Sequence, residues 1–317
     1  MNILHEIEQA EKRIRPHILR TPLIESRELS QLIEGKVFLK MESEQYTGSF
    51  KARGSMNKIL SLTTAEKQQG MITASTGNHA LGCARALEIT QTKGTIYLPK
   101  NASKSKVAAL RHYGAELTFH GTNSLETELY AKQQAKENNH VWISPYDDPQ
   151  IIGGQGTIGL ELCQHLAHID HVLACVGGGG LISGIGTYMK AHRPQTNIVG
   201  CLPENSPEMM LSLEKGEVVM LDEYKETLSD GSAGGLEEDS ITFPICQKVV
   251  DECLLATEAE IAEGISFAVH THRKIIEGAA AVTIACLLKN KEKFKNTRVV
   301  LIICGANIDA EKLKKLI

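Results

Sequence analysis

Features that would place a protein in a membrane, on nucleic acid or outside the cell are missing from this 317-residue sequence. No run of about 18 apolar residues is long enough to span a bilayer, and charged residues throughout positions 1–20 replace the apolar core of a signal peptide. The net charge of −4 gives no basic surface for nucleic acid or an anionic membrane. None of the eight cysteines forms a Cys-x-x-Cys pair, which argues against a disulfide framework. We therefore expect a cytoplasmic protein whose partners are neither nucleic acids nor membranes.

Short runs typical of β-strands alternate with longer helical patterns along the chain. Apolar runs such as Val299–Ile303 have the composition of strands buried on both faces, which predicts parallel sheets covered by helices. We predict an α/β fold with two sheets, because the nine candidate strands exceed a usual single unit. The predicted strands are Val37–Met41, Met71–Ala74, Thr95–Leu98, Glu116–His120, Val141–Ser144, Val172–Val176, Asn197–Leu202, Glu252–Ala256 and Arg298–Cys304. The predicted helices are an N-terminal amphipathic helix, Ala52–Leu62, Asn78–Glu88, Lys104–Tyr113, Ser124–Asn138, Gly159–His168, Leu181–Ala191, Thr257–His270 and Ala279–Lys289.

Four consecutive glycines, Gly177–Gly180, follow an apolar strand and precede a predicted helix. Backbone amides in such a loop, together with the N-terminus of the helix, bind anions such as phosphate. The dinucleotide pattern Gly-x-Gly-x-x-Gly fails because its third glycine position holds Ile182 or Ser183, and the Gly-Lys-Ser/Thr of a triphosphate loop is absent. A small phosphate ligand therefore fits the loop better than a dinucleotide, and a tight structural turn is the alternative.

A second loop, at residues 74–80, also joins a predicted strand to a helix. Ser75 or Thr76 is expected to cap that helix, and Asn78 offers an amide donor near its N-terminus. The alternative interpretation is an ordinary helix start with no ligand.

Lys51 lies at the start of another predicted helix, beside Phe50 and among small residues. Most lysines are solvated surface groups, but a lysine that reacts with an aldehyde needs burial to keep part of its amine unprotonated. Pyridoxal phosphate carries both an aldehyde for Lys51 and a phosphate for the loop Gly177–Gly180. The two motifs together therefore suggest this cofactor.

Several motifs in the same order resemble the serine/threonine dehydratase family of pyridoxal-phosphate enzymes, which includes threonine deaminase and serine racemase. They run from Thr21-Pro22-Leu23 through Thr47–Gly54 and Gly153–Thr157 to Ile303–Asn307, over nearly the whole chain. The resemblance implies the fold type II, or tryptophan synthase β-like, architecture, with the cofactor in the cleft between two domains. The implied large domain comprises residues 1–42 and 145–317, and the implied small domain, residues 43–144, is inserted into it.

The resemblance also implies roles for individual residues. Lys51 would bond to the cofactor aldehyde and act as the catalytic base, and Thr76 would be a second catalytic residue on the opposite ring face. The residues implied around the cofactor are Lys51, Phe50, Asn78, Gly177, Gly178, Gly179, Gly180, Leu181, Gly231, Glu277 and Cys304. The residues implied around the substrate are Ser75, Thr76, Gly77, Asn78 and His79. Asn78 would bond the ring 3-oxygen, and Cys304 would face the pyridine nitrogen as a weak partner that favours β-elimination.

Departures from the family pattern bear on metal binding. Leu202 stands where racemase-like members carry a metal-binding carboxylate, and Ser206 with Glu208 makes an incomplete site, so we expect no essential metal. Three histidines also recur at three-residue spacing without a carboxylate or cysteine that would complete a zinc site. They are His165, His168 and His171.

The resemblance implies an ammonia-lyase (dehydratase) that converts L-threonine or L-serine into a 2-keto acid and ammonia, as a homodimer or homotetramer. One alternative is a related lyase for 3-hydroxyaspartate, phenylserine or a hydroxyectoine-derived compound, although Ser144 and Tyr146 depart from the hydroxyaspartate pattern. Another is a serine racemase-like activity, although Thr76 replaces the racemase serine. From other classes, the alternatives are an inert pyridoxal-phosphate-binding protein and a nicotinamide-dependent dehydrogenase, which the missing dinucleotide pattern disfavours.

Overall fold

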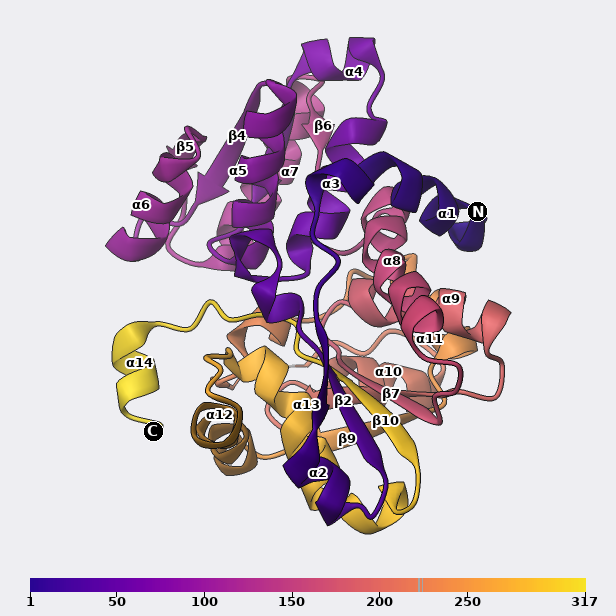
Figure 1. The fold of residues 1–317 in the computed structure, drawn as a ribbon. Helices are drawn as coiled ribbons and strands as arrows, with labels where there is room; N and C mark the ends of the chain where they lie inside the picture. The colour runs from indigo at the N-terminus through magenta and orange to yellow at the C-terminus, as the bar shows by residue number, and fades with distance from the viewer. Residues whose placement is uncertain (222, 224) are drawn as a thin grey trace.

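Two separate β-sheets organise the molecule, as the computed structural model in Figure 1 shows for residues 1–221, 223 and 225–317. The larger sheet has the order β1-β2-β10-β7-β8-β9, with bounds Leu23–Ser26, Lys36–Lys40, Arg298–Ile302, His171–Cys175, Asn197–Pro203 and Glu252–Ala256. The smaller sheet has the order β5-β4-β3-β6, with bounds Glu116–Phe119, Gly94–Leu98, Met71–Ala74 and Val141–Trp142. Every neighbouring pair is parallel except β1 with β2. The predicted α/β class with two mostly parallel sheets is therefore confirmed.

Among the strands of the described residues, the edge strand β1 is the one that the sequence pattern does not predict. Its two central residues, Ile24 and Glu25, are exposed, so it lacks the continuous apolar run of a strand buried on both faces. The other strands lie within two residues of their predicted bounds at either end.

Helices cover both sheets. α9 (Gly180–His192) contacts β7 and β8, and α13 (Gly278–Lys289) contacts β7, β8, β9 and β10 of the larger sheet. α5 (Asn78–Thr90) and α7 (Ser124–Glu137) contact β3 and β4 of the smaller sheet. The remaining helices are α1 (Ile3–Ile14), α2 (Arg27–Leu32), α3 (Lys51–Ser61), α4 (Thr64–Gln69), α6 (Lys104–His112), α8 (Pro149–His165), α10 (Glu208–Lys215), α11 (Thr242–Val249), α12 (Glu258–His272) and α14 (Ala310–Lys314). The helices that the sequence does not predict are short: α2, α4, α10, α11 and α14.

Helix α8 begins at Pro149, well before its predicted start at Gly159. Its glycine-rich first half has low intrinsic helix propensity, but Asp148 caps it by accepting hydrogen bonds from two backbone amides. The glycines serve close packing, because a Cβ on Gly154 would lie 2.6 Å from the Cα of Gly54 in α3. The backbones of α3 and α8 are therefore in contact.

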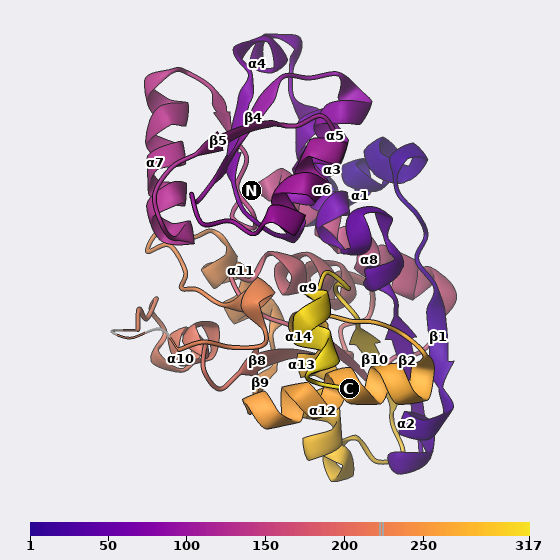
Figure 2. The same cartoon turned by 90° about the vertical axis from the view of Figure 1, so that its left-hand side faces the viewer.

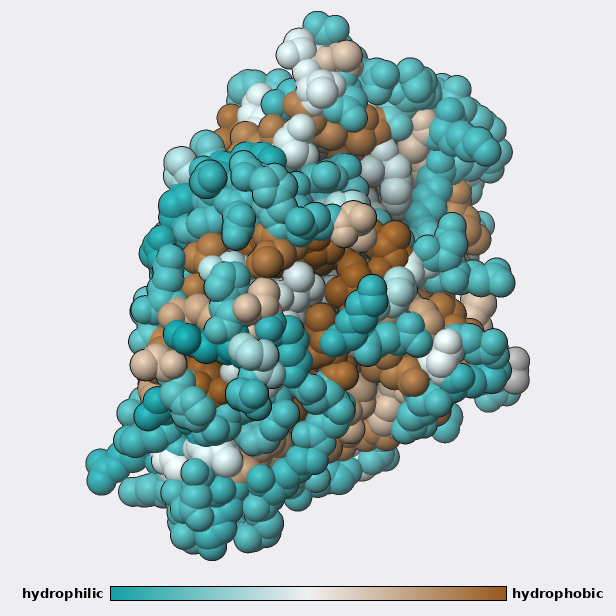
Figure 3. Space-filling model, turned by 90° about the vertical axis from the view of Figure 1, so that its right-hand side faces the viewer, coloured by the Kyte–Doolittle hydropathy of each residue, from teal (hydrophilic) through white to brown (hydrophobic). Residues whose placement is uncertain are grey.

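The smaller sheet and its helices lie above the larger sheet in Figures 1 and 2. Helix α3 contacts both α5 and α8, so it connects the two halves. Apolar residues gather across the middle of one face of the molecule, between its mainly hydrophilic upper and lower parts (Figure 3).

The strands of the smaller sheet fall within residues 71–142, and those of the larger sheet lie before residue 41 and after residue 170. The limits of the two domains, residues 1–42 with 145–317 and residues 43–144, stay a prediction. No helix in the described part of the chain has the length and apolar character needed to cross a membrane.

Candidate active site

The side chain of Lys51 extends from the first residue of α3. Its Nζ donates a hydrogen bond to the Pro145 carbonyl oxygen at 2.7 Å and lies 5.2 Å from the centre of the Phe50 ring. Lys51 keeps some accessible surface, but the protein atoms around its amine desolvate it, and this burial lowers the pKa of Lys51 to about 8. At pH 7 about one such amine in ten is unprotonated. Lys51 therefore has the reactivity that a nucleophilic or basic lysine requires.

Two contacts fix the backbone around Lys51. The amide of Phe50 donates to the carbonyl oxygen of Cys304, just after β10, at 3.0 Å. Helix α5 approaches so closely that a Cβ on Gly82 would lie 3.1 Å from the carbonyl carbon and oxygen of Lys51. The start of α3 is thus held from both halves of the molecule.

The tetraglycine loop, Gly177–Gly180, lies between β7 and α9 as the sequence predicts. A Cβ on Gly178 would lie 2.5 Å from the Tyr146 ring, and a Cβ on Gly177 would lie 2.7 Å from the Ser232 carbonyl oxygen. Helix α9 begins at the last glycine, and its first turn has amides without partners inside the helix. The buried Leu181 follows in that turn. Loop and helix together have the backbone donors of a phosphate cradle.

Pro145 and Tyr146 connect the lysine with the tetraglycine loop. The Pro145 carbonyl accepts from Lys51, and the next residue packs on Gly178 and Gly180, where a Cβ on Gly180 would lie 2.9 Å from the Tyr146 carbonyl oxygen. The amine and the phosphate cradle therefore lie against one dipeptide, within a single site.

Glu277 gathers the donors beside this site. Asn78 Nδ2 donates to its two carboxylate oxygens at 2.8 and 3.1 Å, and the Asn307 amide donates to Oε2 at 3.0 Å. Asn307 Nδ2 also donates to Asn78 Oδ1 at 2.6 Å. Burial raises the pKa of Glu277 to about 7, although the Asn78 hydrogen bond acts in the opposite direction. Gly231 is beside this carboxylate, since a Cβ there would lie 3.6 Å from Oε1.

The loop before α5 corrects one expectation. Gly77, not Ser75 or Thr76, is the N-cap residue of the helix, and the Ser75 hydroxyl accepts from the Gly77 amide at 3.2 Å. The Gly77 Cα faces open space, because a Cβ there would have no neighbour within 4 Å. The backbone of this loop is therefore accessible to a ligand.

His79 points away from that loop into the smaller half. Its Nε2 lies 3.0 Å from Thr73 Oγ1 and 3.2 Å from the Ile143 carbonyl oxygen. Burial lowers the pKa of His79 to about 3, so the ring is neutral at physiological pH. Only the backbone of His79 is placed to meet a substrate at the loop.

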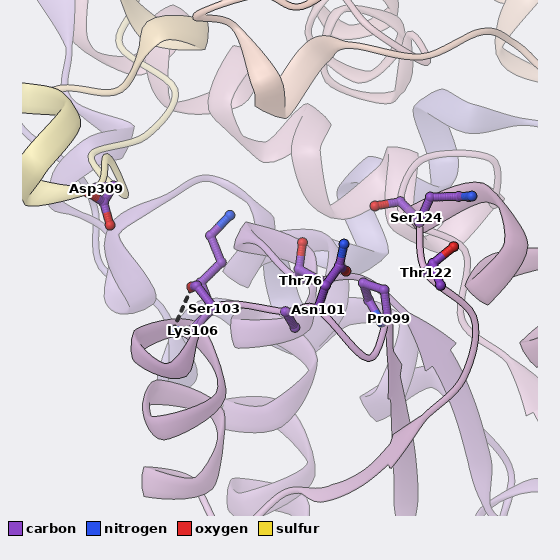
Figure 4. Close-up of a pocket in the computed structure, with 10 residues that line it drawn as sticks. Thr76, Pro99, Asn101, Ser103, Lys106, Thr122, Ser124 and Asp309 are labelled. Atoms are coloured by element: carbon purple, nitrogen blue, oxygen red, sulfur yellow. Dashed lines mark hydrogen bonds between the residues drawn. The ribbon is translucent and has the colours of Figure 1, made fainter.

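Thr76 lines a cavity of about 500 Å³, drawn in Figure 4. Lys106 of α6 and Asp309, just before α14, also line this cavity. Neither residue is predicted from the sequence. The position of the polar loop at residues 99–103 is the available signal for this part of the cavity. That loop follows β4, and β4 is next to β3, so it lies at the same edge of the sheet as the loop that contains Thr76.

Cys304 follows β10 and is buried. Burial raises the pKa of its thiol well above the ordinary range, so the thiol stays protonated and uncharged. The sequence predicts a role for Cys304, but not for the Pro145 carbonyl, which contacts Lys51, or for Asn307, which contacts Asn78. Both become recognisable only when segments far apart in the sequence meet.

The candidate metal-binding residues bond to one another or to other groups. Ser206 Oγ donates to Glu208 Oε2 at 2.6 Å. The three histidines do not converge, because His165 bonds the Glu161 carbonyl, His168 bonds Asp170, and His171 packs edge-on against Phe294. Across the described residues there is no group of three or more His, Cys, Asp or Glu suited to a metal ion.

The site fits pyridoxal phosphate on two observations, the desolvated amine of Lys51 and the tetraglycine loop at the N-terminus of α9, where any Cβ would collide with neighbouring residues. With the two-sheet α/β fold, they define an enzyme that uses a phosphate-bearing carbonyl cofactor. The family model for pyridoxal-phosphate dependent enzymes matches residues 14–305. The chain belongs to this family, and its cofactor is pyridoxal phosphate.

Individual relatives resemble the chain over its full length. An L-threonine ammonia-lyase of Thermotoga maritima is 38% identical over 317 residues, which cover 100% of this chain and 78% of that protein. The solved structure of processed threonine deaminase isoform 2 from Solanum lycopersicum has a TM-score of 0.94 at 34% identity, covering 99% of this chain and 86% of that one. Maize serine racemase has a TM-score of 0.93 at 28% identity, covering 98% and 95%. The resemblance to the serine/threonine dehydratases is therefore confirmed.

Proposed function

We propose that this chain is an ammonia-lyase that converts L-threonine or L-serine into a 2-keto acid and ammonia. The observation that carries the proposal is the Lys51 amine, desolvated and 2.7 Å from the Pro145 carbonyl, beside a phosphate cradle on the same dipeptide. The threonine substrate is supported by the Thermotoga maritima ammonia-lyase and the tomato threonine deaminase, which resemble the chain throughout.

Lys51 is the proposed catalytic residue. Pyridoxal phosphate, when bound, supplies the electron withdrawal that stabilises negative charge at the substrate α-carbon. Lys51 would hold the cofactor through its amine, and the free amine would remove the substrate α-proton as general base. Its lowered pKa leaves part of the amine unprotonated near neutral pH for that step.

The remaining residues position the reacting groups. The amides of Gly177–Gly180 and Leu181 hold the phosphate, and the backbone from Ser75 to His79 holds the substrate carboxylate. Asn78 would offer a remaining hydrogen of its amide nitrogen to the ring oxygen, while the same nitrogen donates to Glu277 and Asn78 Oδ1 accepts from Asn307. Such preorganised donors are a large source of rate enhancement. Phe50 packs beside the lysine and Gly231 beside Glu277.

Cys304 is proposed to face the ring nitrogen. Its thiol remains uncharged because burial raises its pKa, so it offers no negative charge to stabilise a proton there. This neutral partner favours prompt loss of the β-hydroxyl over reactions that need a long-lived carbanion.

A second activity, racemisation of serine, is supported by one observation. Thr76 lines the cavity, and its hydroxyl could carry a proton to the ring face opposite Lys51. Formation of D-serine from L-serine would reveal this activity, and a Thr76→Ala variant should abolish it while keeping keto-acid release.

We also propose that the enzyme works in the cytoplasm as a homodimer or homotetramer and needs no metal. All eight cysteines are free thiols, which suits a reducing compartment. Light scattering of the purified enzyme would measure the oligomeric state.

The first experiment measures keto-acid release from L-threonine, L-serine and threo-3-hydroxyaspartate by cofactor-loaded enzyme in the presence of a chelator. We expect turnover of threonine or serine. In Lys51→Ala we expect turnover to fall at least about a thousandfold, because the substitution removes both the general base and the group that bonds to the cofactor. Lys58→Ala, in the same helix, serves as the matched control and should keep turnover. Turnover retained in Lys51→Ala would contradict the assignment, and a yellow protein inactive on all three compounds would contradict the substrate.

A further inference from the structure

Four ionised side chains are fully buried beneath the first turn of α3. We call them the buried ion cluster: Lys40, Glu42, Arg53 and Glu161, each 0% exposed. They come from β2, the turn after it, α3 and α8. The cluster therefore joins the helix that begins with Lys51 to the larger half of the molecule.

Arg53 is the centre of the cluster. Its Nε and Nη2 donate to the two carboxylate oxygens of Glu42 at 2.7 and 2.8 Å, and its Nη1 donates to Glu161 Oε1 at 2.8 Å. Lys40 Nζ donates to Glu161 Oε2 and to the Thr21 carbonyl oxygen. The planar guanidinium thus engages two carboxylates from different segments, which a lysine at this position could not do.

Stability alone does not account for such an arrangement. Taking charged groups out of water costs several kcal/mol per ion, and well-packed apolar residues often stabilise a protein equally well. What a fully bonded guanidinium adds is a fixed geometry between the segments that hold it. The structure makes this geometry relevant to the site, because Arg53 and Lys51 are in the same helical turn.

The other contacts of this turn also leave it little freedom. The Gly54 backbone touches Gly154 of α8, and a Cβ on Gly54 would lie 2.4 Å from the Gln155 side chain. The largest charge effects on the Lys51 amine come from groups outside the cluster, namely Cys83, Cys304, Glu277 and Glu128. The cluster therefore acts on Lys51 through its placement.

We infer that Arg53 is a positioning residue: held by Glu42 and Glu161, it fixes the first turn of α3 and keeps the Lys51 amine at the Pro145 carbonyl. This inference rests on the proposed role of Lys51 as the lysine that bonds to the cofactor. When the guanidinium is removed, the turn shifts and water reaches the amine.

The test measures bonding of Lys51 to pyridoxal phosphate without using turnover. Purified protein is stripped of cofactor and incubated with pyridoxal phosphate at pH 6–10, the product is reduced with borohydride, and peptide mass mapping gives the fraction of Lys51 that has bonded. Wild type, Arg53→Lys and Arg53→Met are compared, with Arg15→Met as the control. Arg15 also contacts Glu161, at 2.7 Å, but from the surface side.

In Arg53→Met we expect the pH of half-maximal bonding to rise by about one unit or more, because at least about tenfold less of the Lys51 amine is unprotonated at pH 7. Arg53→Lys should show a smaller shift in the same direction, because it keeps the positive charge but loses the planar guanidinium that bonds both carboxylates. Arg15→Met should lower the melting temperature and leave this pH unchanged.

A lowered melting temperature with the wild-type pH of bonding in both Arg53 variants would overturn the inference, since Arg53 would then be merely structural. If Arg53→Met does not fold, Arg53→Lys decides the question in the same way. If wild-type Lys51 does not bond at all, the proposed function itself fails. The two failures are therefore distinguishable.

Discussion

The Glu277 carboxylate sets the orientation of the amide that would meet the cofactor. A carboxylate only accepts hydrogen bonds, so the Asn78 nitrogen must face Glu277. Asn307 fixes the same orientation of the Asn78 amide from the other side, because its Nδ2 donates a hydrogen bond to Asn78 Oδ1. This orientation depends on ionised Glu277, whose pKa is raised to about 7 by burial.

Activity should therefore depend on pH through Glu277. Below pH 7 Glu277 becomes protonated, one oxygen turns into a donor, and the amide network must rearrange. We expect kcat/KM of the wild type to fall more steeply below this pH than protonation of Lys51 alone would cause, and Glu277→Gln to lose that added fall along with part of its activity at pH 8. The nearby groups that also act on this carboxyl are Asp230 and Lys51.

A pH series of keto-acid release from L-threonine would measure the effect, with the exposed Glu238→Gln as the matched control. An equally steep fall in Glu277→Gln would assign the added fall to another group.

Helix α8 shows how tertiary packing overrides local propensity. Its glycines weaken a helix in isolation, yet Gly154 and Gly184 of the neighbouring α9 bring the backbones of α3, α8 and α9 close together. Because α3 starts at Lys51, the spacing between these helices contributes to the position of the amine.

We therefore expect Gly154→Ala to destabilise the protein by about 2 kcal/mol, because its Cβ would lie 2.6–2.8 Å from backbone atoms of Gly54 and Arg53 that cannot move aside. Gly159→Ala, in the same helix, is the control. Its Cβ would meet its neighbours at 3.1 Å or more, so small adjustments suffice. Urea unfolding of both variants measures the difference, and equal effects would rule out close helix contact as the cause.

The elements that the sequence predicts are those with a local pattern. Buried parallel strands such as Arg298–Ile302 carry continuous apolar runs, and the tetraglycine loop is visible from its letters alone. β1 and the first half of α8 lack such patterns, since one is half-exposed and the other is rich in glycine. The site residues divide in the same way. Lys51 and Asn78 lie in recognisable local motifs and are predicted, whereas their partners Pro145 and Asn307 are defined only by contacts between distant segments.

For the whole molecule, a buried neutral histidine makes stability depend on pH. The pKa of His79 is about 3 in the folded state, chiefly because of burial, against an ordinary value of 6.5. Between these pH values the unfolded chain binds a proton that the folded protein does not, so the free energy of unfolding falls as the pH falls. A difference of one bound proton changes the free energy of unfolding by about 1.4 kcal/mol per pH unit, and His79 approaches this value in the middle of the range.

We expect His79→Gln to be less stable at pH 7, since it loses the ring contacts, and to show a shallower loss of stability from pH 6.5 to 4. Urea unfolding across this range checks the slope, with the exposed His5→Gln as the control that keeps it. Identical slopes in wild type and His79→Gln would assign the acid sensitivity to other groups.

The order of strands in the larger sheet determines when the protein can finish folding during its synthesis. β2, at residues 36–40, pairs directly with β10, at residues 298–302, so one of the earliest strands made has to wait for the last. The smaller sheet, made from residues 71–142, has no such wait. Cys304 and Asn307 follow β10 in the chain, and the cofactor site is therefore among the last parts to be assembled as the nascent chain leaves the ribosome.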